Sequence, residues 1–254
     1  MDLQAGKSRC RDLDISIIIP VKNEQENIPL LAKEVDMAMG SMDYSWECIW
    51  LDDGSTDSTL AELERLNRAE SHHQFISLSR NYGQSAALYT GFCYAKGEIL
   101  VTLDGDGQND PADIPALVKR LLDENADMVN GIRQKRRDSV VRKISSRIGN
   151  GFRNRVTKEQ VRDVGCSLRA FRHRCVENIP VFKGMHRFLP TLARIRGCAK
   201  ILEMPVNHRP RVHGQTKYGI GNRLWVGLMD TLAVRWMQAR MVYPEVKNSS
   251  LNNP

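Results

Sequence analysis

Residues 99–111 of the chain read ILVTLDGDGQNDP. The first part of this stretch is an apolar, β-branched run, which is typical of a buried strand. Two aspartates separated by one glycine, Asp104 and Asp106, follow the run directly. Glycine lets a backbone approach a ligand closely, and carboxylate oxygens suit a hard cation, Mg²⁺ or Mn²⁺, that also binds substrate phosphates. The stretch therefore predicts a strand that ends in an acidic, ligand-facing turn.

The sequence around this stretch alternates short apolar runs with helix-like segments. Strands are expected at 15–20, 46–51, 75–79, 99–103 and 127–132. Helices are expected at 26–39, 57–69, 84–95 and 111–123. Alternation of this kind predicts an α/β fold with a mainly parallel sheet covered by helices on both faces.

The pattern becomes less regular after Gly131. The expected elements there are a strand or loop at 162–172, a short helix after it, a strand at 201–206, a loop at 207–221 and a helix at 219–240. In the earlier part of the chain, His72 and His73 are expected to lie in a surface loop.

The composition is that of an ordinary globular protein. The 254 residues are 41% hydrophobic and 26% charged, which excludes a disordered or collagen-like chain and leaves room for a sizeable core. The six cysteines are scattered without a CxxC or a close Cys/His group, which argues against a structural zinc site and a disulfide-stapled secreted domain. Because we find no apolar leader and no apolar run of about 18 residues, we expect a cytoplasmic protein.

The net charge of +7 hides a strong asymmetry. Residues 1–131 hold 11 basic and 23 acidic side chains, and residues 132–254 hold 26 basic and 7 acidic ones, so the two parts carry −12 and +19. The acidic part suits a divalent cation. The basic part suits phosphates, nucleic acid or an anionic membrane surface, or else consists of solvated helix faces.

Polar clusters follow three of the expected strands, at 20–24 (PVKNE), 52–57 (DDGSTD) and 104–108 (DGDGQ). In an open parallel sheet the carboxyl ends of the strands are where ligands bind. Crowded carboxylates repel one another, and a divalent cation relieves that repulsion. The sequence has no P-loop, and no GxGxxG follows the first strand. These clusters therefore predict a nucleotide that is bound through carboxylates and a bridging metal.

Five segments in this order and spacing carry a family resemblance: ISIIIPVKNEQENI, WLDDGSTDST, SLSRNYGQSAALYTGF, LDGDGQNDP and HRPRVHGQTKYG. Together they resemble the family 2 glycosyltransferases of the GT-A fold, in particular the polyprenyl-phosphate, dolichol-phosphate mannosyltransferase-like branch. The resemblance implies transfer of a sugar, with inversion, from a UDP- or GDP-sugar donor to a polyprenyl phosphate. The alternative within the family is a polysaccharide, a lipid A-type or another non-polyprenyl acceptor.

The resemblance also implies a set of donor-binding residues. Those that would surround the nucleotide or lie beside it are Pro20, Val21, Asn23, Glu24, Asp53, Arg80 and Gln84. Asp104 and Asp106 would face the donor, and both would bind Mg²⁺ or Mn²⁺ together with Gln108. Gly105 departs from the family, which often has a non-glycine residue there, but both carboxylates remain.

The basic part of the chain matches the same chemistry, because a leaving diphosphate and an attacking lipid phosphate repel each other unless cations lie between them. Arg133 stands in a G-x-R segment, and Arg211 and Lys217 stand in RPRVHGQTKY, which resembles a loop that closes over the diphosphate. Taken singly, each arginine could be a surface charge.

Asp163, in RDVGCSLRAF, resembles the acceptor-side aspartate of the family. It could orient the acceptor or act as a base, although a phosphate nucleophile is already ionised at pH 7 and needs no strong base. The alternative is an ion pair with Arg162 or Arg169. Ser167 and Arg169 are weaker candidates on the same segment.

We expect four regions in the chain: a tail (1–13), a GT-A domain (14–218) with a nucleotide and metal half (14–131) and an acceptor half (132–218), an amphipathic helix (219–241) and a flexible tail (242–254). The helix at 219–241 and the basic segment 140–155 are both amphipathic, which predicts a peripheral enzyme on the cytosolic face of a membrane. Alternatively, the long helix packs on the domain core, on a second copy or on a membrane-protein partner.

Two hypotheses from other functional classes explain less of the sequence. A nucleic-acid-binding protein would explain the +19 part of the chain but would leave Asp104, Asp106 and the DDGSTD turn without a role. An inactive scaffold would have no need to keep these carboxylates and Arg211. We therefore expect a metal-dependent glycosyltransferase that does not bind nucleic acid.

Overall fold

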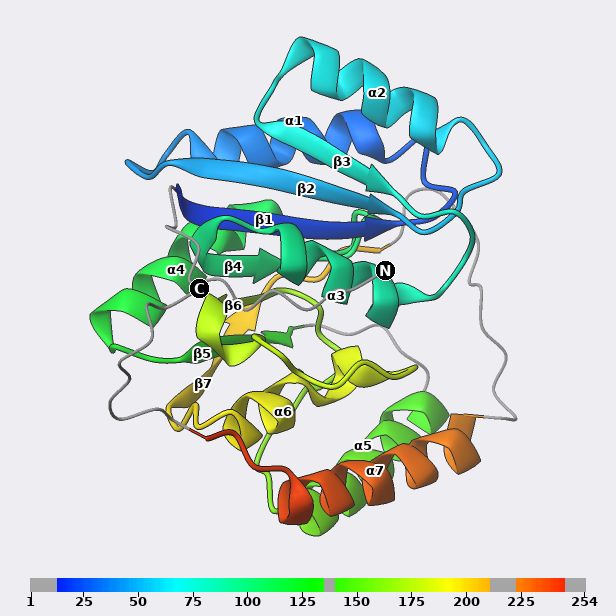
Figure 1. Cartoon of the computed structure of the whole chain (residues 1–254), viewed down its shortest axis with the longest axis vertical. Helices are drawn as coiled ribbons and strands as arrows, with labels where there is room; N and C mark the ends of the chain where they lie inside the picture. Colours follow the sequence, from blue (N-terminus) through cyan, green and yellow to red (C-terminus); the bar gives the residue numbers. More distant parts are fainter. Residues whose placement is uncertain (1–12, 135–139, 211–222, 245–254) are drawn as a thin grey trace, which may run out of the picture.

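The computed structural model describes residues 13–134, 140–210 and 223–244. Its centre is a sheet of seven strands in the order β3-β2-β1-β4-β6-β5-β7 (Figure 1). The strands are β1 (Leu13–Val21), β2 (Trp46–Asp52), β3 (His73–Ser77), β4 (Gly97–Thr102), β5 (Met128–Arg133), β6 (Arg169–Arg172) and β7 (Ile201–Val206). Strand β6 runs antiparallel to both of its neighbours, and the other pairs are parallel. The predicted α/β fold with a mainly parallel sheet is confirmed.

Helices cover both faces of the sheet. They are α1 (Ile28–Met39), α2 (Thr59–Ala69), α3 (Gln84–Tyr94), α4 (Ile114–Asp123), α5 (Val140–Thr157), α6 (Leu189–Ile195) and α7 (Arg223–Arg240), with short 3₁₀ turns η1 (Pro111–Asp113), η2 (His173–Cys175) and η3 (Met185–Phe188). Successive strand residues point to opposite faces, so Ile17 and Ile19 pack with α1 and α4, whereas Ile18 packs with α3. The sheet is therefore buried on both sides, as its continuous apolar strands predict.

Strand β3 begins earlier than expected, and His73 is a core residue rather than part of a surface loop. The indole N–H of Trp50 donates to Nδ1 of His73 at 3.1 Å, and Nε2 of His73 lies 3.0 Å from a carboxylate oxygen of Asp36. Because both ring nitrogens have partners, the imidazole is buried without leaving an unsatisfied polar group.

The reversed strand β6 decides what lies beside the acidic turn. Thr102 at the end of β4 is in register with Arg169 at the start of β6. The segment that leads into β6, with Asp163 and Ser167, is thereby brought to the edge of the sheet where Asp104 follows β4. Residues far apart in the sequence meet at this edge.

Helices α5 and α7 pack side by side at one end of the molecule (bottom of Figure 1). Thr231 and Val234 of α7 are buried, and the Gln238 amide donates to the carbonyl of Thr157 at 2.9 Å. The other side of α7 is apolar and exposed, with Met229, Leu232 and Trp236 at 50%, 48% and 63%. Among the described residues, no helix is both long and apolar enough to cross a bilayer.

Candidate active site

The acidic turn after β4 is shaped by its own hydrogen bonds. The main-chain N–H of Asp104 donates to the Asn109 side chain at 3.0 Å, and Oδ1 of Asp106 accepts from the N–H of Gln108 at 3.1 Å. A Cβ atom on Gly105 would lie 2.5 Å from Cγ1 of Val21, so this turn has no room for a side chain between the two aspartates. The departure from the usual family pattern is therefore a packing requirement of this chain.

The negative charge of the Asp104 carboxylate is unfavourable in its surroundings. Burial, together with the neighbouring carboxylate of Asp106, raises the pKa of Asp104 to about 6. Its Oδ1 accepts from the Gln84 amide at 2.7 Å, and Ser167 donates to Asn109 at 2.7 Å beside it. Two crowded carboxylates and the amide of Gln108 form an all-oxygen set that fits a hard divalent cation.

The loops after β1 and β2 are tied together by Asn23. This residue has a φ of +51°, which asparagine tolerates better than most residues. Its N–H donates to Ser55 Oγ at 2.9 Å, and its side-chain oxygen accepts from the N–H of Thr56 at 2.8 Å. The neighbouring Glu24 is buried and accepts from Asn27 at 2.6 Å. Together with Pro20 and Val21, these predicted nucleotide contacts therefore lie at the carboxyl end of β1.

Asp53 joins the loop after β2 to the start of α3. Its two carboxylate oxygens accept from the main-chain N–H groups of Tyr82 and Gly83 at 2.7 and 2.8 Å. The guanidinium of Arg80 lies over the ring of Tyr82, 4.9 Å from its centre. Gly54, at φ +66°, passes so close that an added Cβ atom would lie 2.5 Å from the Arg80 carbonyl carbon. The structure therefore gives Asp53 a loop-shaping role next to the predicted nucleotide site.

Arg133 and Asp163 form a buried, two-point ion pair. Nε and Nη2 of Arg133 each donate to a different Asp163 oxygen at 2.8 Å, and the Arg133 main-chain N–H donates at 3.2 Å. The two side chains are 16% and 7% exposed. Asp163 thus pairs with Arg133 rather than with Arg162 or Arg169, the partners considered from the sequence.

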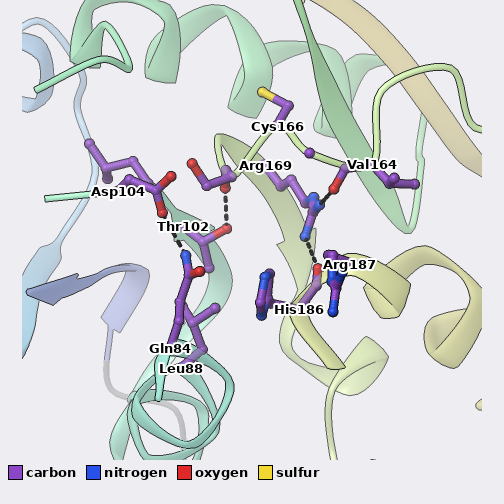
Figure 2. Close-up of a pocket in the computed structure, with 12 residues that line it drawn as sticks. Gln84, Leu88, Thr102, Asp104, Val164, Cys166, Arg169, His186 and Arg187 are labelled. Carbon is purple, nitrogen blue, oxygen red and sulfur yellow. Dashed lines mark hydrogen bonds between the residues drawn. The ribbon is translucent and has the colours of Figure 1, made fainter. Parts of the chain in front are cut away.

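A pocket opens beside Asp104 (Figure 2). Asp104 and Gln84 lie on one side of it, and Arg169, His186 and Arg187 lie on the other. We call the last three residues the basic wall. The pocket thus joins the end of β4 to η3, which is remote in the sequence.

Arg169 of the basic wall is 3% exposed, and its guanidinium donates to the carbonyls of His186 and Val164 at 2.8 and 2.9 Å. Within the described part of the chain no carboxylate pairs with it. Arg187 contacts Asp230 of α7 at 3.3 Å. The wall therefore combines a buried cation, Arg169, with the partly exposed, ion-paired cation Arg187.

His186 is the neutral member of the basic wall. Its Nδ1 lies 2.9 Å from Ser85 Oγ, and the same hydroxyl accepts from the N–H of Gly184 at 3.1 Å. Burial lowers the pKa of His186 to about 3, with Arg187 and Arg169 contributing to the shift.

Nothing in the sequence marks His186 and Arg187 as site residues. They stand in GMHRF, a segment with no recognisable motif or metal spacing, and only Gly184 marks a turn there with its φ of +91°. Arg169 is only a weaker candidate from the sequence.

The predicted loop at 207–221, which we call the basic loop, starts beside the acidic turn. The N–H of Arg209 donates to the Gln108 carbonyl at 2.8 Å, and the Gln108 amide donates to the Arg209 carbonyl at 3.3 Å. The Arg209 guanidinium contacts Glu34 and Asp110 at 2.7 and 2.6 Å. The predicted phosphate-binding residues Arg211 and Lys217 lie outside the described residues.

Comparison with known proteins adds two findings from sequence. Residues 16–179 match the profile of the family described as glycosyl transferase family 2. The dodecaprenyl-phosphate galacturonate synthase of Rhizobium johnstonii is 36% identical over 237 residues, which cover 92% of this chain and 70% of that protein. The undecaprenyl-phosphate 4-deoxy-4-formamido-L-arabinose transferase of Salmonella choleraesuis is 40% identical over 205 residues, which cover 80% of this chain and 62% of that protein. The chain thus spans about two thirds of the length of these relatives.

The fold also resembles solved structures. Glucosyl-3-phosphoglycerate synthase from Mycobacterium tuberculosis, in complex with Mn²⁺ and UDP-glucose, superposes with a TM-score of 0.64. The two chains are 22% identical, and the match covers 88% of this chain and 79% of the other. At this identity the similarity concerns the fold.

Proposed function

Because the chain belongs to glycosyl transferase family 2, we propose that it moves a sugar, with inversion, from a nucleoside diphosphate to a polyprenyl phosphate. The observation that carries this proposal is the pocket where Asp104, the first carboxylate of the acidic turn after β4, lies opposite the basic wall. Carboxylates suit the cation that accompanies a diphosphate, and guanidinium groups suit anions.

Asp104, Asp106 and Gln108 would hold Mg²⁺ or Mn²⁺. The donor set fits, since it consists of oxygen ligands and since the raised pKa of Asp104 indicates a site where added positive charge is favourable. When bound, the ion offsets the negative charge of the leaving diphosphate.

The acceptor needs no deprotonation. A phosphate monoester oxygen attacks the anomeric carbon, and the bond to the diphosphate breaks with its electron pair leaving on the nucleoside diphosphate. Asp163 therefore acts as a positioning residue, which fixes the guanidinium of Arg133 through two bonds of 2.8 Å. Arg133 in turn helps to bring the acceptor phosphate close to the donor.

Arg211 and Lys217 would bind the diphosphate from the basic loop. The proposal is supported by the contacts of Arg209 with Gln108, Asp110 and Glu34, which fix the start of this loop next to the acidic turn. Pro20, Val21, Asn23, Glu24, Asp53 and Arg80 would enclose the nucleotide from the loops at the carboxyl ends of the first strands.

The donor sugar would occupy the pocket, with its hydroxyls toward Asp104 and Gln84. The basic wall favours a sugar that bears a carboxylate, because a guanidinium can donate two parallel hydrogen bonds to it. The galacturonate named for the Rhizobium relative has such a group, and the formamido sugar named for the Salmonella relative does not. UDP-uronic acids are therefore the first donors to test.

The exposed apolar face of α7 would rest on the cytosolic surface of the membrane that holds the lipid acceptor. Met229, Leu232 and Trp236 of this face are at least 48% exposed. Helices α5 and α7 also carry basic residues, which would favour an anionic membrane surface. A second copy of the chain or a membrane-protein partner could cover the same face, and vesicle sedimentation distinguishes these cases.

The test is release of nucleoside diphosphate by the purified protein. The panel contains UDP- and GDP-sugars, acidic and neutral, with Mg²⁺ or Mn²⁺ and with or without a polyprenyl phosphate. Release that needs both metal and lipid phosphate, and is lost in Asp106→Ala, supports the proposal. Release without the lipid phosphate indicates hydrolysis or another acceptor and contradicts it.

A further inference from the structure

Two cysteines that are scattered in the sequence meet in the core. Cys175 lies at the end of η2 and Cys198 lies between α6 and β7. Their sulfur atoms are 2.8 Å apart, and the two residues are 0% and 4% exposed. Since a disulfide bond is about 2.05 Å long, a relative movement of under about 1 Å brings the sulfurs to bonding distance.

A metal site is the alternative use of these thiols, because a carboxylate oxygen of Asp127 lies within 4.8 Å of both. The carboxylate is already engaged, however, by Arg174 at 2.5 Å and by the N–H of Lys200 at 2.9 Å. Tetrahedral zinc, with Zn–S distances of about 2.3 Å, also holds two sulfurs about 3.7 Å apart. The observed spacing therefore fits a cross-link better than a zinc site.

We propose that Cys175 and Cys198 are an oxidisable pair that forms an internal disulfide with hydrogen peroxide as the oxidant. The thiolate of Cys198 attacks one peroxide oxygen, which gives a sulfenic acid and releases water after proton uptake. The thiol of Cys175 then attacks that sulfur and forms the S–S bond, and its proton leaves with the sulfenic OH as the second water. Two thiols lose two electrons in total, and one peroxide is reduced to two waters.

The local chemistry agrees with this order of events. The hydrogen bond between the two sulfurs lowers the pKa of Cys198, and Arg174 acts in the same direction. Cys198 is also the more exposed of the two. Because the thiolate is the nucleophile, the lowered pKa of Cys198 makes it the first of the two to react.

The cross-link would close the segment 175–198, which includes η3 and α6 and carries His186 and Arg187 of the basic wall. It lies away from the acidic turn: His173 contacts the carbonyl of Gly97 at the start of β4, and the length of that strand puts Asp104 roughly 20 Å away. The disulfide therefore stabilises the wall-bearing segment without contacting the acidic turn.

The experiment compares reduced protein with protein treated with hydrogen peroxide, and it needs no turnover. We expect a mass loss of about 2 Da, a linked peptide pair containing Cys175 and Cys198, and a Tm higher by roughly 5 to 10 °C. All three changes should reverse with dithiothreitol and be absent in Cys175→Ala and Cys198→Ser. Cys93→Ser, at a half-buried cysteine, is the matched control and should behave like the parent.

Three results would overturn the proposal: no linked peptide in the parent protein, oxidation of Cys198 to sulfinic acid with Cys175 still reduced, or one tightly bound zinc per chain. If the cysteine variants fail to fold, the peptide map of the parent protein decides alone.

Discussion

Arg133 and Asp163 hold each other in one geometry, with two parallel hydrogen bonds of 2.8 Å between nearly buried side chains. Such a fork fixes the plane of the guanidinium as well as its position. The pair comes from two segments, the end of β5 and the approach to β6, which the chain brings together only in the folded sheet. A cation at this point is therefore preorganised before any acceptor arrives.

The substitution Asp163→Asn should release the guanidinium of Arg133 from its fixed position. Removing one partner of a buried pair costs about 3–5 kcal/mol of stability, and the freed guanidinium should raise KM for the lipid phosphate more than KM for the donor. The measurement is steady-state kinetics with each substrate varied, together with urea unfolding. Glu98→Gln, which breaks the exposed pair with Arg172, is the control and should change neither KM. A loss confined to kcat, with an altered pH profile, would instead make Asp163 a base.

Asp106→Asn should abolish metal-dependent donor binding. We expect the affinity for a nucleoside diphosphate with Mn²⁺ to fall at least about a hundredfold, because one ligand of the cation is lost. Calorimetry measures this directly. Asp123→Asn removes an exposed carboxylate of α4 that pairs with Lys119 and should bind like the parent. Unchanged affinity in Asp106→Asn would remove the acidic turn from the donor site.

Arg187→Gln should change which sugar is used. Because the variant loses a cation of the basic wall and keeps a polar side chain, kcat/KM should fall about tenfold or more for a UDP-uronic acid and change little for the neutral UDP-hexose. Competition between the two donors in one reaction gives the ratio. An equal loss of kcat/KM for both donors would mean that Arg187 supports the structure of the pocket without discriminating between the two sugars.

His186 should make the fold sensitive to acid. Its pKa is lowered to about 3 in the folded protein, so below the unfolded value of about 6.5 the unfolded chain binds the extra proton. The contribution to stability is intact above pH 6.5 and is lost as pH falls toward 3, with about 2 kcal/mol lost by pH 5. Unfolding titrations at pH 7 and pH 5 should show a smaller loss in His186→Gln. His72→Gln, at a partly exposed histidine, is the comparison, and an identical slope in both variants would contradict the assignment.

The double variant Leu232→Asp and Trp236→Asp should release the protein from membranes. Both side chains are about half exposed on α7, so the fold should tolerate the change while sedimentation with anionic vesicles falls about tenfold or more. Met37→Asp, at a 69% exposed position on α1, is the control for a new surface charge. If the parent protein does not bind vesicles at low salt, the face serves a protein partner.

The sequence predicts most of the sheet because its strands are strongly apolar. Residues 15–20 and 99–103 can only be buried runs, and each ends in polar residues that must lie at one edge. Strand β6 is harder to predict. It has four residues with arginine at both ends, and its pairing depends on β4 and β5, which are distant in the chain.

The arrangement of the candidate site was predictable where its residues lie close together in the sequence. Asp104 and Asp106 follow a strand directly, so their place at one edge of the sheet could be predicted from the sequence, whereas their role as metal ligands was inferred from the family resemblance. His186 contacts Ser85 across 101 residues, and Cys175 contacts Cys198 across 23. Neither contact follows any helical or strand period, so tertiary packing alone creates the basic wall and the thiol pair.

The insertion of β6 between β4 and β5 also bears on protein engineering. An exchange between relatives of the part of the chain after Gly131 would separate the regular βα pattern from the less regular remainder of the sequence. In the sheet it would place a foreign strand between two native ones, with Arg169 opposite Thr102 and Asn130. Chimeras should therefore keep β4, β5 and β6 from one parent, and donor and acceptor preferences in this fold are expected to evolve together rather than by recombination of halves.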